Sequence, residues 1–574
     1  MRKGLHAKLH ASGGARVHWL IEPADMGLCD INDRTRSLYH VSLQADQASG
    51  ITPGMPDALP TRPRQSFRSR LMQTIRNAST AQRFLAVLLV IFLFKGILIT
   101  LIFPPYSGHD EVTHYAYLKV VSEEGRVPLI PDPDVFDYEY TRDDTYAGWD
   151  MIPDAFYKYA GQYITKDWWG GYAEPVRAVT YEGAYLPSGW IYTGNHPPLF
   201  YLLMVPVFQA VQGLDIDTQI YFFRLATIPF GMVTVLLAYL TTRTIFPRDR
   251  FLAMTVPAFV AFQPQIAYES AMLNNDILAI MFTSAVIWMI AVGLRKRFPL
   301  WNCLLIGLFF GLAMLSKSTS VTTGALIAFA MVFGLGWRNI REWLPKGALA
   351  AGVAGLLIWP WLLYMWSTYG DLTALGRISV LQKWWNYGGG EGRSIWSMAS
   401  DKWFFWDRWR ETWGAFGWRL IQLDTNSATL LRVVLWITFF ATMGLAVYAL
   451  RFLRTQREID AAEELGEDAS VVRYQSDETL SVMPWQVTAI LTMGITCVVS
   501  YYAILQFGTT FSLTQARYYF PAIVPGGLLF MLGVRSWFPR RWLPWVGAAT
   551  FLGLVLLNLI IYTAYVIPYW NQNV

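Results

Sequence analysis

The sequence predicts an all-α protein that crosses a membrane many times. Of its 574 residues, 54% are hydrophobic and 15% are charged, and the mean hydropathy is +0.30. Apolar runs of about 16 to 25 residues recur along the chain, close to the length that a helix needs to cross a bilayer. The 26 tryptophans and 30 tyrosines suit the aromatic belts found at membrane surfaces. The length of the chain therefore reflects a series of spans rather than several soluble domains.

We expect about eleven transmembrane helices, each built on one apolar run. They cover residues 84–103, 220–244, 251–268, 276–294, 301–316, 319–336, 347–366, 429–450, 485–505, 518–534 and 544–567. Clusters of arginine and lysine favour the cytoplasmic side of a membrane. Such clusters occur near residues 243–250, 295–297, 338–346, 451–483 and 535–541. Placing all of them inside puts the N-terminus in the cytoplasm and the C-terminus outside.

Residues 1–80 are expected to form a disordered cytoplasmic tail. They lack sustained periodicity, end in a basic stretch with proline and serine, and contain no apolar core of a signal peptide. Met72 is a candidate initiator, so residues 1–71 need not belong to the native protein. Residues 84–567 then form the transmembrane domain.

Two large loops are expected on the outer side, at residues 104–219 and 367–428, and a charged cytoplasmic insert is expected at 451–483. Residues 197–211 are apolar but short for a span. If this segment crossed the membrane, every later basic loop would face outward. We therefore expect an interfacial or re-entrant helix within the first outer loop.

The composition also restricts the partners. The 46 basic and 41 acidic residues give a formal net charge of +5, and the basic loops account for the surplus, so no nucleic acid is expected. The three cysteines lie far apart, which argues against a disulfide framework or a zinc site. The sequence contains no P-loop, H-E-x-x-H or G-x-S-x-G motif, so an ATP-driven pump, a helical zinc protease and a nucleophile-elbow hydrolase are not supported.

A cluster of ionisable residues follows the first predicted span directly. It contains His109, Asp110, Glu111 and His114. Ionisable groups at a membrane boundary are candidates for function. In a helix, Asp110 and His114 would lie on one face because they are four positions apart. The alternative is that Ser107 and Asp110 form a capping box, whose only role is to start that helix.

Five short motifs resemble, in order, the signatures of the GT-C membrane glycosyltransferases. The similarity is greatest to bacterial protein O-mannosyltransferases and lipid A aminoarabinose transferases, and it extends over residues 84–567. The motifs are S-G-H-D-E-V-T-H-Y-A-Y from Ser107, N-H-P-P-L-F-Y-L-L from Asn195, N-N-D-I-L-A-I from Asn274, G-L-A-M-L-S-K from Gly311 and Q-A-R-Y-Y-F-P from Gln515. His109 departs from the pattern, because relatives often have a small residue, Pro or Tyr before the acidic pair.

The resemblance implies a GT-C-like helical bundle with interfacial helices in a large first outer loop. It also implies an inverting enzyme of the cell envelope that takes a sugar from a polyprenyl-phosphate carrier in the membrane lipid. The acceptor would be a hydroxyl of a protein, lipid or glycan at the outer face of a bacterial inner membrane. Asp110 matches the acid that this family is considered to use as general base, and Glu111 stands beside it as a second catalytic candidate.

The sequence allows two interpretations of this acidic pair. Adjacent carboxylates repel each other, so the pKa of one of them could be raised. Alternatively, a divalent cation such as Mg²⁺ or Mn²⁺ could bind Asp110 and Glu111 together with nearby histidines. His109 and His114 are also candidates for substrate binding.

The leaving group would be a lipid phosphate, which requires cationic partners near the membrane surface. Arg517 and Lys317 are the candidates, and snorkelling of long basic side chains to the interface is the alternative for both. His196 and Asp276 complete the set. For these two the alternatives are an incidental histidine at a Pro-Pro helix start and an acid that suits a helix N-terminus.

A non-enzymatic transporter or flippase for lipid-linked sugars is the alternative function. An enzyme requires Asp110 and Arg517 to converge on one outer cavity, whereas a carrier requires polar residues along a path through the bilayer. Apart from Lys95, the centres of the predicted spans are nearly free of charge, which favours the enzyme. For Lys95 we expect an acidic or carbonyl partner in the bundle, because an unpaired ammonium there costs about 3 kcal/mol.

Overall fold

The computed structural model describes residues 79–130, 192–378, 393–417, 419, 421–423, 429–465, 477–509 and 515–572. The chain divides into two units, Met1–Gln73 and Thr74–Val574, and every described residue belongs to the second unit. The expected disordered tail therefore lies almost entirely outside the described residues.

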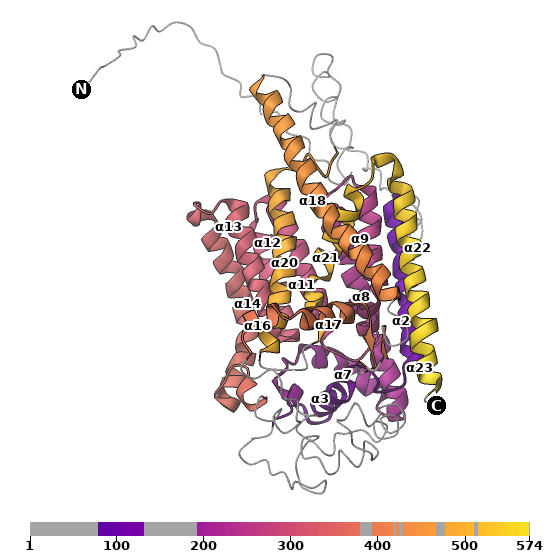
Figure 1. The fold of residues 1–574 in the computed structure, drawn as a ribbon. Coiled ribbons are helices and arrows are strands. Elements are labelled where there is room, and N and C mark those ends of the chain that lie inside the picture. The colour runs from indigo at the N-terminus through magenta and orange to yellow at the C-terminus, as the bar shows by residue number, and fades with distance from the viewer. Residues whose placement is uncertain are drawn as a thin grey trace, which may run out of the picture. The chain divides into compact units, whose positions relative to one another are not determined.

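The described part is built from helices (Figure 1). They are α2 (Thr80–Ile102), α3 (Glu111–Glu124), α7 (Leu199–Val211), α8 (Ile216–Ile245), α9 (Arg250–Phe262), α10 (Pro264–Glu269), α11 (Asp276–Lys296), α12 (Leu300–Ser316), α13 (Thr323–Leu335), α14 (Ile340–Tyr369), α16 (Ile395–Ala399), α17 (Lys402–Trp413), α18 (Thr429–Glu464), α20 (Pro484–Gly508), α21 (Ile523–Ser536), α22 (Leu543–Ile561) and α23 (Ile567–Gln572). Short helical turns are η1 (Tyr192–Asn195), η2 (Ser318–Thr322), η3 (Ala516–Ala522), η4 (Arg540–Trp542) and η5 (Tyr562–Val566). A small antiparallel hairpin pairs β1 (Ala415–Phe416) with β2 (Ile421–Gln422).

Within the described residues, nine helical segments are long and apolar enough to cross a membrane. They are Thr80–Ile102, Ile216–Ile245, Asp276–Lys296, Ser318–Leu335, Ile340–Tyr369, Thr429–Glu464, Pro484–Gly508, Ala516–Ser536 and Arg540–Asn571. The predicted class, an all-α multi-pass membrane protein, is confirmed. The two remaining predicted spans coincide with shorter apolar helices, α9 and α12, so the count of eleven stays a prediction.

The first span, α2, has one face packed against other helices and another face that is exposed. Ser79 caps α2 through a capping box with Gln82. Leu88 and Phe92 are buried against the other helices, whereas Phe94, on another face, is 60% exposed. An exposed apolar face on a helix of this length suits contact with lipid.

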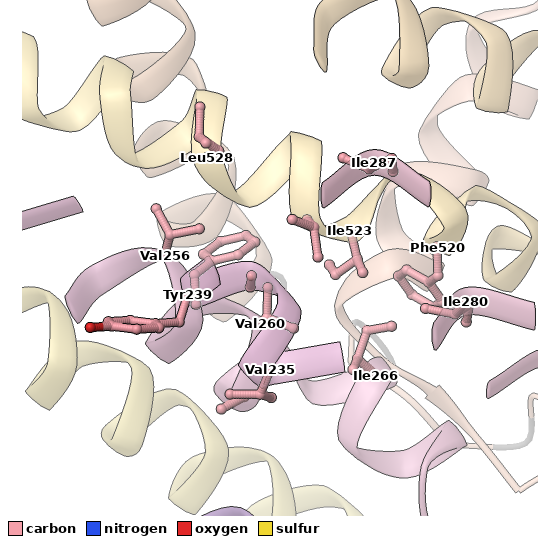
Figure 2. Packing of buried hydrophobic residues seen from close by; sticks show 14 of the residues in the cluster. Val235, Tyr239, Val256, Val260, Ile266, Ile280, Ile287, Phe520, Ile523 and Leu528 are labelled. Carbon is pink, nitrogen blue, oxygen red and sulfur yellow. The ribbon is translucent and has the colours of Figure 1, made fainter. Parts of the chain in front are cut away.

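The long helices pack side by side, while α3 and α7 lie together at one end of the bundle and α17 runs across the helices near that end (Figure 1). The core links α8, α9 and α21 with α10, α11 and η3 (Figure 2). Buried members of this core are Val235, Tyr239, Val256, Val260, Ile266, Ile280, Ile287, Phe520, Ile523 and Leu528. Because α10, α11 and η3 carry site residues at their ends, this packing fixes the frame of the site.

Several loops differ in detail from the expectation. The insert expected at 451–483 begins as helix, because α18 continues to Glu464. The segment expected to be the second outer loop, residues 367–428, contains α16, α17 and the β1–β2 hairpin. The segment expected to be interfacial forms α7, whose 13 residues are short for a span and which packs on α3 through a shared hydrophobic cluster.

Candidate functional site

The turn before α3 presents the carboxylate of Asp110. Asp110 adopts a left-handed backbone conformation with φ +59° and makes no side-chain capping bond, and α3 begins at the next residue. The hydroxyl of Ser107 donates to the carbonyl of Pro104 at 2.7 Å. The capping-box interpretation of Ser107 and Asp110 is therefore wrong, since the serine closes the turn and leaves the Asp110 carboxylate available.

Four of the predicted site residues meet in one ionic cluster, which we call the Asp110 cluster. The Asp110 carboxylate binds the guanidinium of Arg517, although the two residues are 407 positions apart. Arg517 Nε lies 3.5 Å from Asp276 Oδ2, and Asp276 also binds the ammonium of Lys317. The cluster thus joins two carboxylates with two cations, which is the balance that buried charges require.

Local hydrogen bonds hold the members of the Asp110 cluster in place. Asn274 Oδ1 accepts from the backbone N–H of Ile277 at 3.1 Å, which fixes the turn that presents Asp276 at the start of α11. Asn275 Nδ2 donates to the carbonyl of Ser316 at 2.9 Å and so ties this turn to the end of α12. Lys317 follows directly on Ser316 and is thereby brought to Asp276.

The electrostatics keep Asp110 ionised. Burial alone would raise the pKa of its carboxyl, but the Arg517 guanidinium and the neighbouring His114 outweigh this and hold the pKa of Asp110 well below its usual range. Asp110 is therefore negatively charged at neutral pH. While it is paired with Arg517, however, it is a weak base.

The two histidines that flank this cluster are linked through a tyrosine. His114 Nδ1 lies 2.9 Å from the hydroxyl of Tyr201, and the same hydroxyl lies 3.4 Å from His196 Nδ1. Tyr201 in turn stacks on Tyr117, with ring centroids 3.5 Å apart. Burial lowers the pKa of His114 to about 4 and places the pKa of His196 well below its usual range, so both are neutral at pH 7.

Acidification is expected to destabilise the protein through His114. Because its folded-state pKa of about 4 lies below the unfolded value, the unfolded state binds more protons between about pH 6.5 and 4. The contribution of the neutral His114 side chain to the free energy of unfolding is complete above pH 6.5. It is lost as the pH falls toward 4, which lowers the free energy of unfolding by an amount on the order of 2–3 kcal/mol. Thermal unfolding at pH 7.5 and 4.5 should show a smaller fall in Tm for His114→Asn than for the wild type. An equal fall would contradict this role of His114.

Glu111 does not join the Asp110 cluster. Its Oε1 accepts from Arg224 Nε at 2.8 Å and from the backbone N–H of Leu273 at 3.0 Å. Its Oε2 accepts from Arg224 Nη2 at 2.5 Å and from the N–H of Gly108 at 2.8 Å. A Cβ atom at Gly108 would lie 2.4 Å from Glu111 Cδ, so glycine is needed for this approach. Each carboxylate oxygen of Glu111 thus already accepts two hydrogen bonds.

Arg224 was missed in the sequence analysis. It lies in α8, is fully buried, and also donates to the carbonyls of Phe103 at 2.7 Å and Pro104 at 2.8 Å. It therefore joins the end of α2 to α3 through Glu111. The sequence signal for this residue is an arginine inside an apolar run. Lys95 donates to the carbonyl of Ala261 at 3.2 Å, the kind of partner expected for it.

The predicted metal pair, Asp110 and Glu111, does not fit a divalent cation. A hard cation takes six or more oxygen ligands, whereas each of these carboxylates is matched by a guanidinium, that of Arg517 or that of Arg224. Across the described ranges, no group of three or more His, Cys, Asp and Glu side chains is arranged to hold a metal ion.

His109 lies at a different edge of the cluster. Its Nδ1 is 3.6 Å from Glu269 Oε1, and its ring packs edge-on against Tyr268 with centroids 5.6 Å apart. Glu269 is completely buried and accepts from Gln265 Nε2 at 3.0 Å. His109 also lines a small hollow together with Arg517. The predicted histidines thus lie around the Asp110 cluster, and Glu269, at the end of α10, lies beside His109.

One protein family matches part of the chain. Residues 195–364 match the family model of dolichyl-phosphate-mannose-protein mannosyltransferase. This segment includes His196, Asp276 and Lys317, whereas Asp110 and Arg517 lie outside it. The search of curated proteins finds no match.

Solved structures give distant likenesses. The oligosaccharyltransferase AglB of Archaeoglobus fulgidus, in complex with an inhibitory peptide and a dolichol-phosphate, has 14% identity and a TM-score of 0.46, and the match covers 85% of this chain and 56% of that one. ArnT from Cupriavidus metallidurans, bound to undecaprenyl phosphate, has 13% identity and a TM-score of 0.40, with 85% and 73% covered. The chain spans about half the length of the oligosaccharyltransferases that it matches. The family match over residues 195–364 supports the resemblance to membrane glycosyltransferases for the three motifs that begin at Asn195, Asn274 and Gly311.

Proposed function

We propose that the chain is an inverting membrane glycosyltransferase. It moves a sugar from a polyprenyl-phosphate carrier to a hydroxyl of a protein, lipid or glycan at the outer face of a bacterial inner membrane. One observation carries the proposal: an acid, Asp110, and a buried guanidinium, Arg517, converge from distant parts of the chain in one ionic cluster. The proposed reaction needs both groups at one place.

The chemistry follows from these two groups. The acceptor hydroxyl attacks the anomeric carbon from the side opposite the phosphate, and its proton passes to the Asp110 carboxylate. The bond between the anomeric carbon and the phosphate oxygen breaks, and its electrons leave with the polyprenyl phosphate. Arg517 and Lys317 stabilise the negative charge that develops on this phosphate. A single displacement of this kind inverts the anomeric configuration.

The ion pair between Asp110 and Arg517 gives donor binding a second role. A donor phosphate competes with Asp110 for the N–H groups of Arg517. As Arg517 turns to the phosphate, Asp110 loses its main cationic partner, and its pKa rises. Donor binding thus converts a weak base into a stronger one at the moment when a base is needed.

A flippase for lipid-linked sugars is the weaker candidate. It would need polar groups free to follow a moving head group through the bilayer. Within the spans, however, Lys95 is held by the carbonyl of Ala261 and Arg224 by Glu111. The Asp110 cluster instead gathers its charges at one place, which favours transfer chemistry.

The test uses purified full-length protein in detergent with a panel of polyprenyl-phosphate sugars and acceptors. The proposal predicts that polyprenyl phosphate and glycosylated acceptor are released in equal amounts, and that the product has the inverted anomeric configuration by NMR. The matched transport assay uses proteoliposomes with lipid-linked sugar in one leaflet. Flipping without release of carrier phosphate across the panel would overturn the enzyme proposal.

A further inference from the structure

A small hollow beside the Asp110 cluster is lined by more cationic groups than the proposed reaction uses so far. The residues around it include His109, Gln265, Glu411, Arg419, Gln515 and Arg517. Arg517 approaches from η3 and Arg419 from the turn of the β1–β2 hairpin. Two guanidinium groups from separate parts of the chain therefore border one space.

Among the buried side-chain atoms that line this hollow, the unpaired hydrogen-bond donors outnumber the unpaired acceptors. Arg419 Nε and Arg517 Nη1 are buried and have no hydrogen-bond partner within the described ranges. The side chain of Arg517 is only 5% exposed, so water does not readily satisfy it. Of the acceptors lining the hollow, Gln515 Oε1 is a buried atom without a partner among the described residues. Buried N–H groups left unpaired are costly, and a multivalent oxyanion is the ligand that would satisfy several at once.

Glu411 holds Arg419 in position. This carboxylate is 3% exposed, binds the guanidinium of Arg419, and accepts from Arg408 Nη2 at 3.0 Å. It also accepts from the backbone N–H of Ala516 at 3.1 Å, the residue before Arg517. One acid thus couples the hairpin that carries Arg419 to the turn that carries Arg517.

The backbone of Arg419 supports the same interpretation. Its φ is +67°, in the left-handed region that an arginine rarely adopts. Such a conformation persists only where surrounding contacts enforce it, here the bond to Glu411 and the hydrogen bond from Gln422 Nε2 to the Arg419 carbonyl at 3.1 Å. The hairpin therefore presents the Arg419 side chain in a fixed position beside the site.

We propose that Arg419 is a second phosphate ligand, and that the phosphate of the polyprenyl carrier binds between Arg419 and Arg517. This inference rests on the proposed function. The hollow has a volume of only about 10 Å³, room for about one water, so a phosphate binds there only when Arg517 turns away from Asp110. Arg517 contributes its unpaired Nη1 and the N–H groups that it releases when the phosphate displaces Asp110, and Arg419 contributes those not engaged by Glu411. The sugar is thereby placed on the side of Asp110.

The test measures binding of a short-chain polyprenyl phosphate to the full chain in detergent by isothermal titration calorimetry. Arg419→Gln should raise Kd about 10- to 100-fold, because it removes a charged ligand. Arg419→Lys should lose less, since it keeps the charge but not the planar fork. Arg393→Gln is the matched control, because Arg393 pairs with Asp401 in the same loop and is 36% exposed. Its Kd should stay unchanged.

Inorganic phosphate serves as the second probe. It distinguishes a site for the phosphate of the lipid carrier from a site for free phosphate. Weaker binding of both ligands in Arg419→Gln supports the head-group site. A loss for inorganic phosphate alone would assign the hollow to free phosphate and overturn the inference, as would unchanged binding of both. If Arg419→Gln fails to fold, the Arg419→Lys comparison decides in the same way. A wild-type protein that binds no carrier would instead contradict the proposed function itself.

Discussion

Asp110→Asn is expected to lower kcat by a factor of about 10²–10⁴, the usual contribution of a general base. Asparagine keeps the shape of the side chain but cannot accept the proton of the acceptor hydroxyl. The variant should bind polyprenyl phosphate at least as tightly as the wild type, because Arg517 loses the carboxylate that competes with the phosphate. The measurements are the rate of carrier-phosphate release at saturating donor and the Kd of the carrier.

Asp371→Asn is the matched control for this prediction. Asp371 follows α14, and its carboxylate accepts a hydrogen bond from the N–H of Thr373 at 3.0 Å and another from the Thr373 hydroxyl at 3.1 Å. Its kcat should remain that of the wild type. Full turnover by Asp110→Asn would remove Asp110 as the base. A loss of turnover accompanied by a loss of carrier binding would instead show that the substitution damages the site as a whole.

Arg224→Met should destabilise the protein by about 3–5 kcal/mol, because it leaves the Glu111 carboxylate buried without its cation. Both side chains are completely buried, and Arg224 also holds the backbone carbonyls at the end of α2. The free energy of unfolding in detergent, from denaturant titration followed by tryptophan fluorescence, checks the prediction. Lys95→Met is a useful comparison, since Lys95 has a carbonyl rather than an acid as partner.

A double-mutant cycle separates a structural role of Glu111 from a catalytic one. We propose that Glu111 positions the turn that carries Asp110, so Glu111→Gln should lower stability, and adding it to Arg224→Met should cost less than the sum of the two single changes. If Glu111→Gln abolished turnover while stability and carrier binding stayed at wild-type values, Glu111 would be a catalytic group and the proposed role would fail.

Most of the fold could be predicted because the membrane imposes a simple rule on the sequence. A helix must be about 20 apolar residues long to cross, and the chain shows such runs plainly. The rule was less informative where a run contains a break. Residues 251–268 form two helices, because Gln263 takes an extended conformation and Pro264 starts the next helix as its first residue.

The site residues that could be predicted are those whose own motif contains an acidic or basic side chain suited to the reaction. Asp110, Asp276, Lys317 and Arg517 stand in motifs whose order suggested one location, and the structure brings them together. The partner of Glu111 could not be inferred, because the packing of α3 against α8 selects Arg224 rather than any spacing in the sequence.

The loop at residues 367–428 follows the same rule. Its sequence is rich in aromatic residues, and its charged residues stand singly among them. Glu411 and Arg419 acquire a role only when the β1–β2 hairpin folds back beside η3. Contacts of this kind depend on tertiary structure and leave no periodic signal in the sequence.

The most direct measurement is a cryo-electron microscopy map of the full chain with polyprenyl phosphate bound. The account predicts density for the phosphate within hydrogen-bonding distance of the Arg517 guanidinium, with the Asp110 carboxylate next to the position that the sugar would occupy. A phosphate bound elsewhere in the bundle, with the ion pair between Asp110 and Arg517 intact, would contradict the central claim that this cluster is the site of transfer.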